Sequence, residues 1–289
     1  MSIAIRSKLF GLAATSLLAG SGAAHAAGGE LKDSEQALLF GTSFEVASLS
    51  DFNIAGNPPV ITSDHTRAGT RSLKTYLHRQ ESSVAYRTEV RVPGHDTIGE
   101  EYWYGFSVLL PSPFPADNLM DIVAQWHGHP DAGEENQNPP LQLNMRDGKW
   151  QIKTTWNAIQ PTIKANQQSV MINVGTPQTD QWTDWVFRVK WSYGSDGILQ
   201  VWKNGDKVVD RTGPNCFNDE QGLFFKLGLY KPSWKEDRVW SGRAGTVDER
   251  TIYHDELRVA GKGASYADVA PRGGSSRPVP PKLSVAGRE

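Results

Sequence analysis

The residues best suited to chemistry lie in three short segments, 86–91, 125–129 and 224–231, where polar side chains recur at every second position. Because successive side chains of a β-strand point to opposite faces, each set would share one face of its strand. The three sets supply guanidinium, amide, imidazole, ammonium and phenol groups. Those groups suit a β-elimination, in which a weakly acidic proton next to a carboxylate is removed and a sugar oxygen leaves.

The first segment offers cations for a carboxylate. On a strand, Arg87, Glu89 and Arg91 would point to one face. Arginine binds carboxylates through two parallel hydrogen bonds, so Arg87 is expected to act on a substrate carboxylate, with Glu89 and Arg91 as binding residues. The alternative is a solvated strand face on which an arginine and the glutamate pair with each other.

The second segment places an amide beside an imidazole. Gln125 and His127 would share a strand face, and Trp126 would pack behind it. Trp126 is nevertheless included among the substrate-binding residues. A histidine on a strand can also be a hydrogen-bonded structural residue, but the amide two positions away favours His127 as a base.

The third segment puts an ammonium group, a gap and a phenol in line, at Lys226, Gly228 and Tyr230. A lysine at an inward strand position is costly unless it is paired. A glycine within a strand often marks the close approach of a ligand or of another backbone. The alternative is an exposed face with no role. The residues between them would face the core: Phe225, Leu227 and Leu229.

Together the three segments fit elimination from a uronic acid polymer. Arg87 and Gln125 would neutralise the sugar carboxylate and stabilise the enolate-like intermediate. A base would remove the C5 proton and an acid would protonate the departing O4, with His127 and Tyr230 as the candidates. Lys226 would favour the phenolate or bind the charge of the substrate.

These segments resemble those of the jelly-roll polysaccharide lyases. Alginate lyases of that fold carry Arg-x-Glu-x-Arg, Gln-x-His and Tyr-Phe-Lys-x-Gly-x-Tyr in this order, and a phenylalanine here replaces the first tyrosine of the third motif. Gln-Trp-His with a downstream Lys-x-x-x-Tyr more closely resembles heparin lyase I and glucuronan lyase. The resemblance covers about 38–262. It implies a secreted lyase centred on His127 and Tyr230, with Arg87 and Gln125 neutralising the carboxylate.

The elements that must position these groups are predicted to be strands. Alternation of period two dominates the middle of the chain, without a helical period. Asn204-Gly205 between two apolar runs predicts a hairpin. We therefore expect an all-β fold, an antiparallel two-sheet jelly roll of the concanavalin-like sandwich type with a concave substrate groove. One lyase domain is predicted over 38–262, because no linker interrupts it.

Both ends of the chain are predicted to lie outside that domain. Two early basic residues, an apolar stretch and Ala24-His25-Ala26 are typical of a cleaved signal peptide, so 1–26 predicts a secreted or periplasmic protein. Residues 27–37 would be a flexible segment and 263–289 a flexible tail. Removing the signal leaves 28 basic against 32 acidic residues, a net charge of −4.

Composition narrows the classes of partner. The 289-residue chain has a formal net charge of −2, which removes the bulk electrostatic argument for nucleic acid. No apolar run approaches the length of a membrane-spanning helix. We expect a monomer that binds an acidic polysaccharide, with no nucleic acid partner and no membrane contact once the signal is removed. Cationic groups must then gather locally to bind a polyanion.

Metal ligands and one further substrate contact are predicted elsewhere. Glu45 and Asp255 resemble the structural calcium ligands of lectin-like jelly rolls, and calcium there would stabilise the fold without performing chemistry. No organic cofactor is expected, and no His, Asp and Glu cluster has zinc spacing. If its strand lines the groove, His78 is expected to bind substrate as a second charge neutraliser or as the partner of Tyr230; otherwise it is a surface histidine. The loop 131–140 is either a lid or a solvated loop.

The leading hypothesis is a secreted, endo-acting lyase on a 1,4-linked polyuronide, with glucuronan first and alginate or heparin-type substrates open. In glucuronate and mannuronate H5 and O4 lie on the same side, so Tyr230 could be base and acid in turn. In guluronate and iduronate they are opposed, which makes His127 the base. The alternative is a non-catalytic carbohydrate-binding jelly roll. A glycoside hydrolase ranks last, because no strand carries Glu-x-Asp-x-x-Glu.

Overall fold

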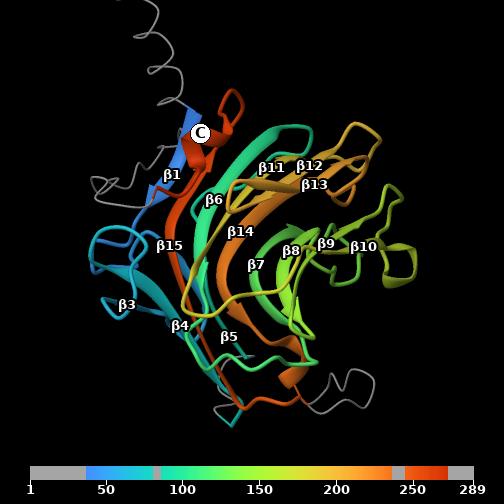
Figure 1. The fold of residues 1–289 in the computed structure, drawn as a ribbon. Coiled ribbons are helices and arrows are strands. Elements are labelled where there is room, and N and C mark those ends of the chain that lie inside the picture. Colours follow the sequence, from blue (N-terminus) through green and yellow to red (C-terminus); the bar gives the residue numbers. More distant parts are fainter. Residues whose placement is uncertain (1–36, 81–85, 236–244, 273–289) are drawn as a thin grey trace, which may run out of the picture.

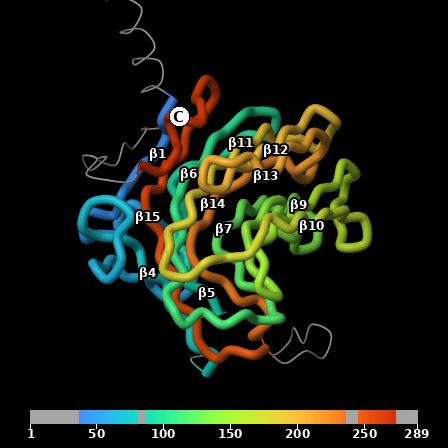
Figure 2. Tube along the Cα trace, in the orientation of Figure 1, coloured from blue at the N-terminus to red at the C-terminus, as the bar shows by residue number. Residues whose placement is uncertain are grey.

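The computed structural model describes residues 37–80, 86–235 and 245–272, which form two antiparallel sheets packed face to face (Figure 1 and Figure 2). Sheet A has the strand order β13 (Asp206–Thr212), β12 (Ile198–Lys203), β11 (Trp182–Lys190), β6 (Glu101–Leu109), β15 (Glu249–Ala260), β4 (Ser72–His78) and β3 (Val60–Thr62), and β1 (Leu38–Thr42) also pairs with β15. Sheet B has the order β10 (Gln168–Asn173), β9 (Lys149–Trp156), β8 (Leu141–Arg146), β7 (Asp121–His129), β14 (Gln221–Tyr230), β5 (Arg87–Arg91) and β2 (Asn53–Gly56). The predicted two-sheet jelly roll is confirmed.

The two sheets bend in the same sense, with β15 and β6 on the outside of the curve and β14, β7 and β8 inside it (Figure 1). One face of sheet B packs against sheet A, so its other face is the hollow side of the curve. Phe225, Leu227 and Leu229 of β14 are buried in the core between the sheets, as predicted. The residues that alternate with them therefore belong to the hollow face.

Aromatic side chains fill the core behind this hollow face. Trp126 of β7 stacks on Phe225 of β14 with ring centroids 4.6 Å apart, and it contacts Phe187 of β11 at 4.9 Å. Tyr104 of β6 meets the same tryptophan edge-on at 5.1 Å. Such contacts add to the free energy gained by burying large apolar surfaces. The heavy aromatic content of the chain thus holds the two sheets together.

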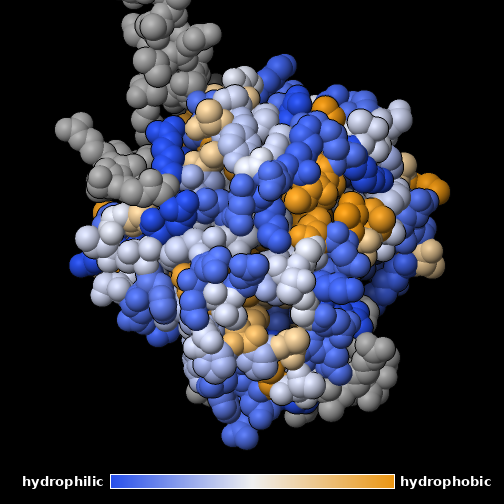
Figure 3. Space-filling model, in the orientation of Figure 1, coloured by the Kyte–Doolittle hydropathy of each residue, from blue (hydrophilic) through white to orange (hydrophobic). Residues whose placement is uncertain are grey.

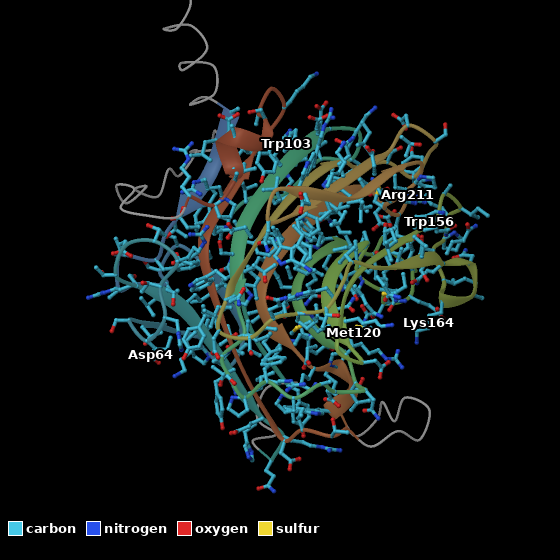
Figure 4. All side chains as sticks on the ribbon, in the orientation of Figure 1. Asp64, Trp103, Met120, Trp156, Lys164 and Arg211 are labelled. Atoms are coloured by element: carbon cyan, nitrogen blue, oxygen red, sulfur yellow. The ribbon has the colours of Figure 1, made fainter. Side chains whose placement is uncertain are left out.

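The predicted hairpin is confirmed between β12 and β13. Asn204 and Gly205 have φ angles of 50° and 88°, the left-handed conformation that a two-residue type I′ turn requires at both positions. At the other end of β13, away from the turn, a contact crosses between the two sheets. Arg211 of β13 lies over the ring of Trp156 of β9 at 4.7 Å, as Figure 4 shows. The contact ties an outer strand of sheet A to sheet B.

Short helices complete the described part of the chain: η2 (Lys164–Asn166), η3 (Pro232–Trp234) and α2 (Tyr266–Val269). None of the helices described is long and apolar enough to cross a membrane. The predicted flexible tail is corrected at its start, because Val269 is buried in a small cluster with Trp103 of β6 and Ala260 of β15. The rest of the tail, the signal peptide 1–26 and nearly all of segment 27–37 lie outside the described residues.

Candidate active site

Three neighbouring strands of sheet B carry the predicted site residues, with β14 between β7 and β5. The register sets four groups side by side across these strands: Phe224 with His127; Gln125, Lys226 and Arg91; Gly228 with Glu89; and Tyr230 with Arg87. All of them alternate with core residues, so they belong to the hollow face. His127 and Tyr230 thus stand at opposite ends of one polar cluster, with the ammonium, amide and carboxylate groups between them.

Glu89 is the central carboxylate of this cluster and is only 1% exposed. The Gln125 amide nitrogen donates a hydrogen bond to Oε1 of Glu89. The Lys226 Nζ lies 3.3 Å from Oε2, and an Arg87 guanidinium nitrogen lies 3.7 Å from the same oxygen. A buried carboxylate requires such partners. Glu89 was predicted as a binding residue, and in this geometry it orients the three side chains that surround it.

Positive charge exceeds negative charge on this face. Arg87, Arg91 and Lys226 face the single carboxylate of Glu89, a formal net charge of +2. Burial lowers the pKa of the Lys226 ammonium, although the charge of Glu89 beside it acts in the opposite direction. An acidic chain has therefore gathered cations on one strand face, which is what binding of a polyanion requires.

Tyr230 is held by Arg87. The guanidinium carbon lies 4.0 Å from the centroid of the Tyr230 ring, a cation–π contact on two adjacent strands. The Nε of Arg87 is buried without a hydrogen-bond partner, so the guanidinium keeps donor capacity for a ligand. Arg91 makes the same kind of contact at the other end of β5, 4.0 Å from the Phe224 centroid. Each arginine is positioned by an aromatic ring of β14.

His127 is a neutral imidazole, and one of its two ring nitrogens is already hydrogen-bonded. Its Nδ1 lies 2.9 Å from the carbonyl oxygen of Gly128, which can only accept a hydrogen bond, so Nδ1 carries the proton. The Nε2 therefore keeps its lone pair, as a base requires. Burial lowers the pKa of His127 to about 4, and the charges of Lys226 and Arg87 lower it further. The ring also stacks on Phe224 at 5.6 Å.

The pH dependence of the reaction should report this environment. We expect kcat/KM to fall only as pH drops through about 4, because the depressed pKa keeps His127 neutral above that value. The measurement is kcat/KM against pH on the polymer that the enzyme cleaves. Lys226→Met should move this acid limb to higher pH, since it removes a positive charge near the imidazole. An acid limb near the ordinary histidine pKa, about 6.5, would contradict the assignment.

The polar face continues beyond the predicted residues onto β8 and β9. Gln142 and Lys153 extend the row that contains Gln125, and Asn144 lies one step along β8. The Oε1 of Gln142 and both amide atoms of Asn144 are buried without hydrogen-bond partners, so they are available to hydroxyl groups of a sugar. Sequence reasoning missed all three. The alternation of Leu141, Leu143 and Met145 with polar residues was the signal that could have found them.

Position 228 requires glycine, because a side chain there would clash with the neighbouring strand β5. Its φ is +147°, and a Cβ built there would lie 2.7 Å from the Cα of Glu89 and closer still to the carbonyl oxygen of Thr88. Of the two explanations offered by the sequence, the close approach of another backbone is the correct one. The glycine lets β5 pack tightly enough on β14 for Arg87 to reach Tyr230.

Two predicted binding residues do not reach the hollow face. Trp126 is completely buried on the core side of β7, so it cannot touch a polymer in the groove. His78 lies on β4 in sheet A, opposite Glu249, on the strand face that alternates with the core residue Leu77. Its Nδ1 accepts a hydrogen bond from the backbone amide of Gln80 at 3.2 Å. Both predictions are corrected: Trp126 supports the site from behind, and His78 belongs to the other sheet.

The predicted calcium ligands, Glu45 and Asp255, both hold one loop at the edge of sheet A. Asp255 accepts hydrogen bonds from the backbone amides of Arg67 and Ala68 at 2.8 and 3.2 Å. Glu45 accepts hydrogen bonds from the amide and the hydroxyl of Thr70 at 2.9 and 2.8 Å. Burial raises the pKa of Asp255 to about 7. These donors account for both carboxylates without a metal ion, so calcium at this place stays a prediction.

A hollow of ≈ 550 Å³ lies beyond the His127 end of the site. Arg91, His95, His129 and Gln221 are among the residues that line it. The surface in the view of Figure 3 is mostly hydrophilic, with hydrophobic residues in a few small groups. The arginine and the two histidines in this lining suit a negatively charged chain better than an apolar ligand.

Comparison with known proteins gives one family match. A family described as polysaccharide lyase matches residues 44–258. Among solved structures, the endo-β-1,4-glucuronan lyase from the fungus Trichoderma reesei is similar with a TM-score of 0.69 and 22% identity, over 82% of this chain and 99% of that one. The alginate lyase AlyC3 is similar with a TM-score of 0.46 and 14% identity, over 66% of this chain and 75% of that one. No curated protein matches the sequence.

The two kinds of match carry different weight. At these identities, the likeness to the glucuronan lyase shows a shared fold. The family match spans more than two thirds of the sequence and includes every strand of the polar cluster. The chain therefore belongs to the polysaccharide lyase family and is a polysaccharide lyase.

Proposed function

We propose that this lyase is secreted and that it cleaves a 1,4-linked glucuronan-type polymer within the chain by β-elimination. The observation that carries the proposal is the cluster on β5, β7 and β14. It combines a neutral imidazole, a phenol and a net positive charge on one hollow face. A module that only binds sugars would not need to bring these three features together.

The reaction needs a stabilised carbanion next to the sugar carboxylate. Arg87, through its unpaired Nε, would hold the carboxylate and take up the charge that develops on it. Gln125 uses one amide hydrogen on Glu89 and keeps a second for the substrate. Lys226 adds positive charge beside them. Glu89 would act by fixing these groups before the substrate arrives.

The proton transfers then follow the stereochemistry of glucuronate. H5 and O4 lie on the same side of the ring, so one group can serve both. Tyr230, as the phenolate, takes the C5 proton, the C–H electron pair forms the C4–C5 double bond, and the C4–O4 bond breaks. The phenol returns the same proton to O4. The neutral Nε2 of His127 would hold the proton that the phenol loses beforehand, which must pass through water because the two groups stand at opposite ends of the cluster.

Glucuronan is placed first among the substrates for two reasons. One of the similar solved structures, which covers 82% of this chain, is a glucuronan lyase. A net charge of −4 without the signal peptide also disfavours a heavily sulfated polymer such as heparin. Mannuronate in alginate has the same syn geometry as glucuronate. Guluronate and iduronate are opposed at C4 and C5, and they would need His127 as base and Tyr230 as acid.

The test is a panel of polymers. The protein without residues 1–26 is mixed with glucuronan, alginate, heparin, hyaluronan and pectate, and the ultraviolet absorbance of the unsaturated uronate is followed. We expect the fastest rise on glucuronan, with oligosaccharides of many lengths appearing early because cleavage is internal. A faster rise on guluronate blocks of alginate would overturn the syn mechanism. Export is tested separately, by the N-terminal residue of protein recovered outside the cytoplasm.

A further inference from the structure

Three carboxylates gather beside the end of β7, outside the site described above. Asp131 and Glu134 come from the loop that follows β7, and Asp219 precedes β14. One oxygen of each lies within 4.8 Å of the others. Asp219 is only 8% exposed. In the part of the chain that the structure describes, no lysine, arginine or histidine forms an ion pair with any of the three.

Neutral donors hold this cluster without cancelling its charge. Thr162 donates its backbone amide to Glu134 at 2.6 Å, and Glu220 donates its backbone amide to Asp131 at 2.9 Å. Burial raises the pKa of Asp219 to about 7, and the neighbouring charges of Glu134 and Asp131 act in the same direction. When all three groups are ionised they repel one another, and none of the ion pairs in the described part of the chain supplies a cation to offset them.

Gln137 supplies an independent indication of what that partner is. The side chain is 4% exposed, and its Nε2 donates to both Glu134 and Asp219 at 2.9 Å. This fixes the orientation of the amide, because the reversed amide would place its oxygen against two carboxylates. Its Oε1 is buried with no hydrogen-bond partner. A buried acceptor without a donor is costly, so a ligand is expected there.

The unpaired Oε1 of Gln137 and one carboxylate oxygen of Asp219 both lie beside Gly128. A Cβ built on Gly128 would lie 2.9 Å from Oδ2 of Asp219 and 3.2 Å from Oε1 of Gln137. While Asp219 is ionised, both atoms are acceptors, so no hydrogen bond can form between them. Hard cations bind to groups of acceptor oxygens. Here two acceptor oxygens lie beside one glycine, within a cluster of three carboxylates.

We propose that Asp131, Glu134, Gln137 and Asp219 bind a calcium ion. All donors are oxygens, which excludes the nitrogen and sulfur ligands that zinc prefers. Two ligands of one Ca²⁺ lie at most about 4.8 Å apart, twice its usual distance of about 2.4 Å to oxygen, and the three carboxylates meet that limit. Calcium also tolerates irregular loop geometry, whereas Mg²⁺ demands a near-ideal octahedron.

The ion would fasten two loops next to the candidate base. The loop after β7 and the segment before β14 would share one ligand set. Gln137 of the one and Asp219 of the other lie beside Gly128, whose carbonyl oxygen fixes the proton on Nδ1 of His127. The site is separate from Glu45 and Asp255, which hold a loop of sheet A.

The test measures calcium binding directly. The whole protein is treated with a chelator, and calcium is titrated by calorimetry and in thermal unfolding, with magnesium in parallel. We expect calcium to bind and to raise Tm, and Asp219→Asn to weaken that binding by at least about tenfold. Without calcium, at a pH above about 7 where Asp219 is ionised, Asp219→Asn should have a higher Tm than the unchanged protein, because one of three repelling charges is gone. A purely structural cluster would not give these opposite effects.

Two further variants complete the experiment. Asp131→Asn, at a carboxylate that is less buried than Asp219, should also weaken calcium binding and serves if Asp219→Asn does not fold. Glu45→Gln is the control for the other predicted calcium site, since it removes a carboxylate beside sheet A and should leave binding at Asp219 unchanged. The proposal is wrong if up to about 10 mM calcium, beyond the range of weak extracellular sites, neither binds nor shifts Tm. It is equally wrong if Glu45→Gln abolishes the binding and Asp219→Asn preserves it.

Discussion

Tyr230→Phe is expected to lower kcat by about 10³-fold while leaving polymer binding nearly unchanged. The substitution removes one hydroxyl group, which in the proposed reaction takes the C5 proton and returns it to O4. The ring itself remains, so Arg87 can keep its contact at 4.0 Å and still hold the carboxylate. The measurements are initial rates from the ultraviolet absorbance of the product and the Kd for the uncut polymer.

The matched control is Tyr193→Phe, at an exposed tyrosine between β11 and β12. It should keep both kcat and Kd. If Tyr230→Phe kept more than about a tenth of the activity, a contribution below what general acid–base groups make, another group would have to move the proton. An equal loss of binding and turnover would instead place Tyr230 among the residues that only hold the substrate.

Gly228→Ala is expected to lower the free energy of unfolding by about 3 kcal/mol, from backbone strain at positive φ and overpacking together. The new Cβ would meet the backbone of β5 at Thr88 and Glu89, and neither strand can yield without breaking their pairing. Urea unfolding measures the change. Activity should also fall, because any shift of β5 moves Arg87 away from Tyr230.

Gly94→Ala separates the two causes. Gly94 also has a positive φ, of 90°, but nothing lies within 4 Å of a Cβ built there. It should therefore cost only the backbone strain, about 1 kcal/mol. Equal destabilisation by the two substitutions would mean that the contact between β14 and β5 has no steric cost, which would overturn the account of Gly228.

Strand alternation was enough to predict which faces the central residues occupy. A period of two leaves one choice per strand, and apolar neighbours settle it, as Leu227 and Leu229 do for Tyr230. The same rule argues against Trp126 as a binding residue, because Gln125 and His127 on either side of it face the hollow.

Strand pairing is what the sequence could not provide. The alternation around His78 is as clear as that around Arg87, yet β4 joins sheet A and β5 joins sheet B. Asn144 resembles no catalytic motif, and only the pairing of β8 with β7 brings it near the site. Gln137 and Asp219 are 82 positions apart and meet through loops, for which no periodic signal exists.

The two faces of sheet B impose a rule for engineering a heat-resistant form of this enzyme. Trp126 in the core and His127 on the hollow face are consecutive residues of one strand, and Phe225 and Lys226 form a similar pair on β14. If a core side chain in β5, β7 or β14 is repacked, the shift of the strand would therefore displace the neighbouring active-site side chain by about as much as the core side chain. Stabilising substitutions belong in sheet A and in the loops at its edges, where tighter packing can be gained without altering the alignment of the reacting groups.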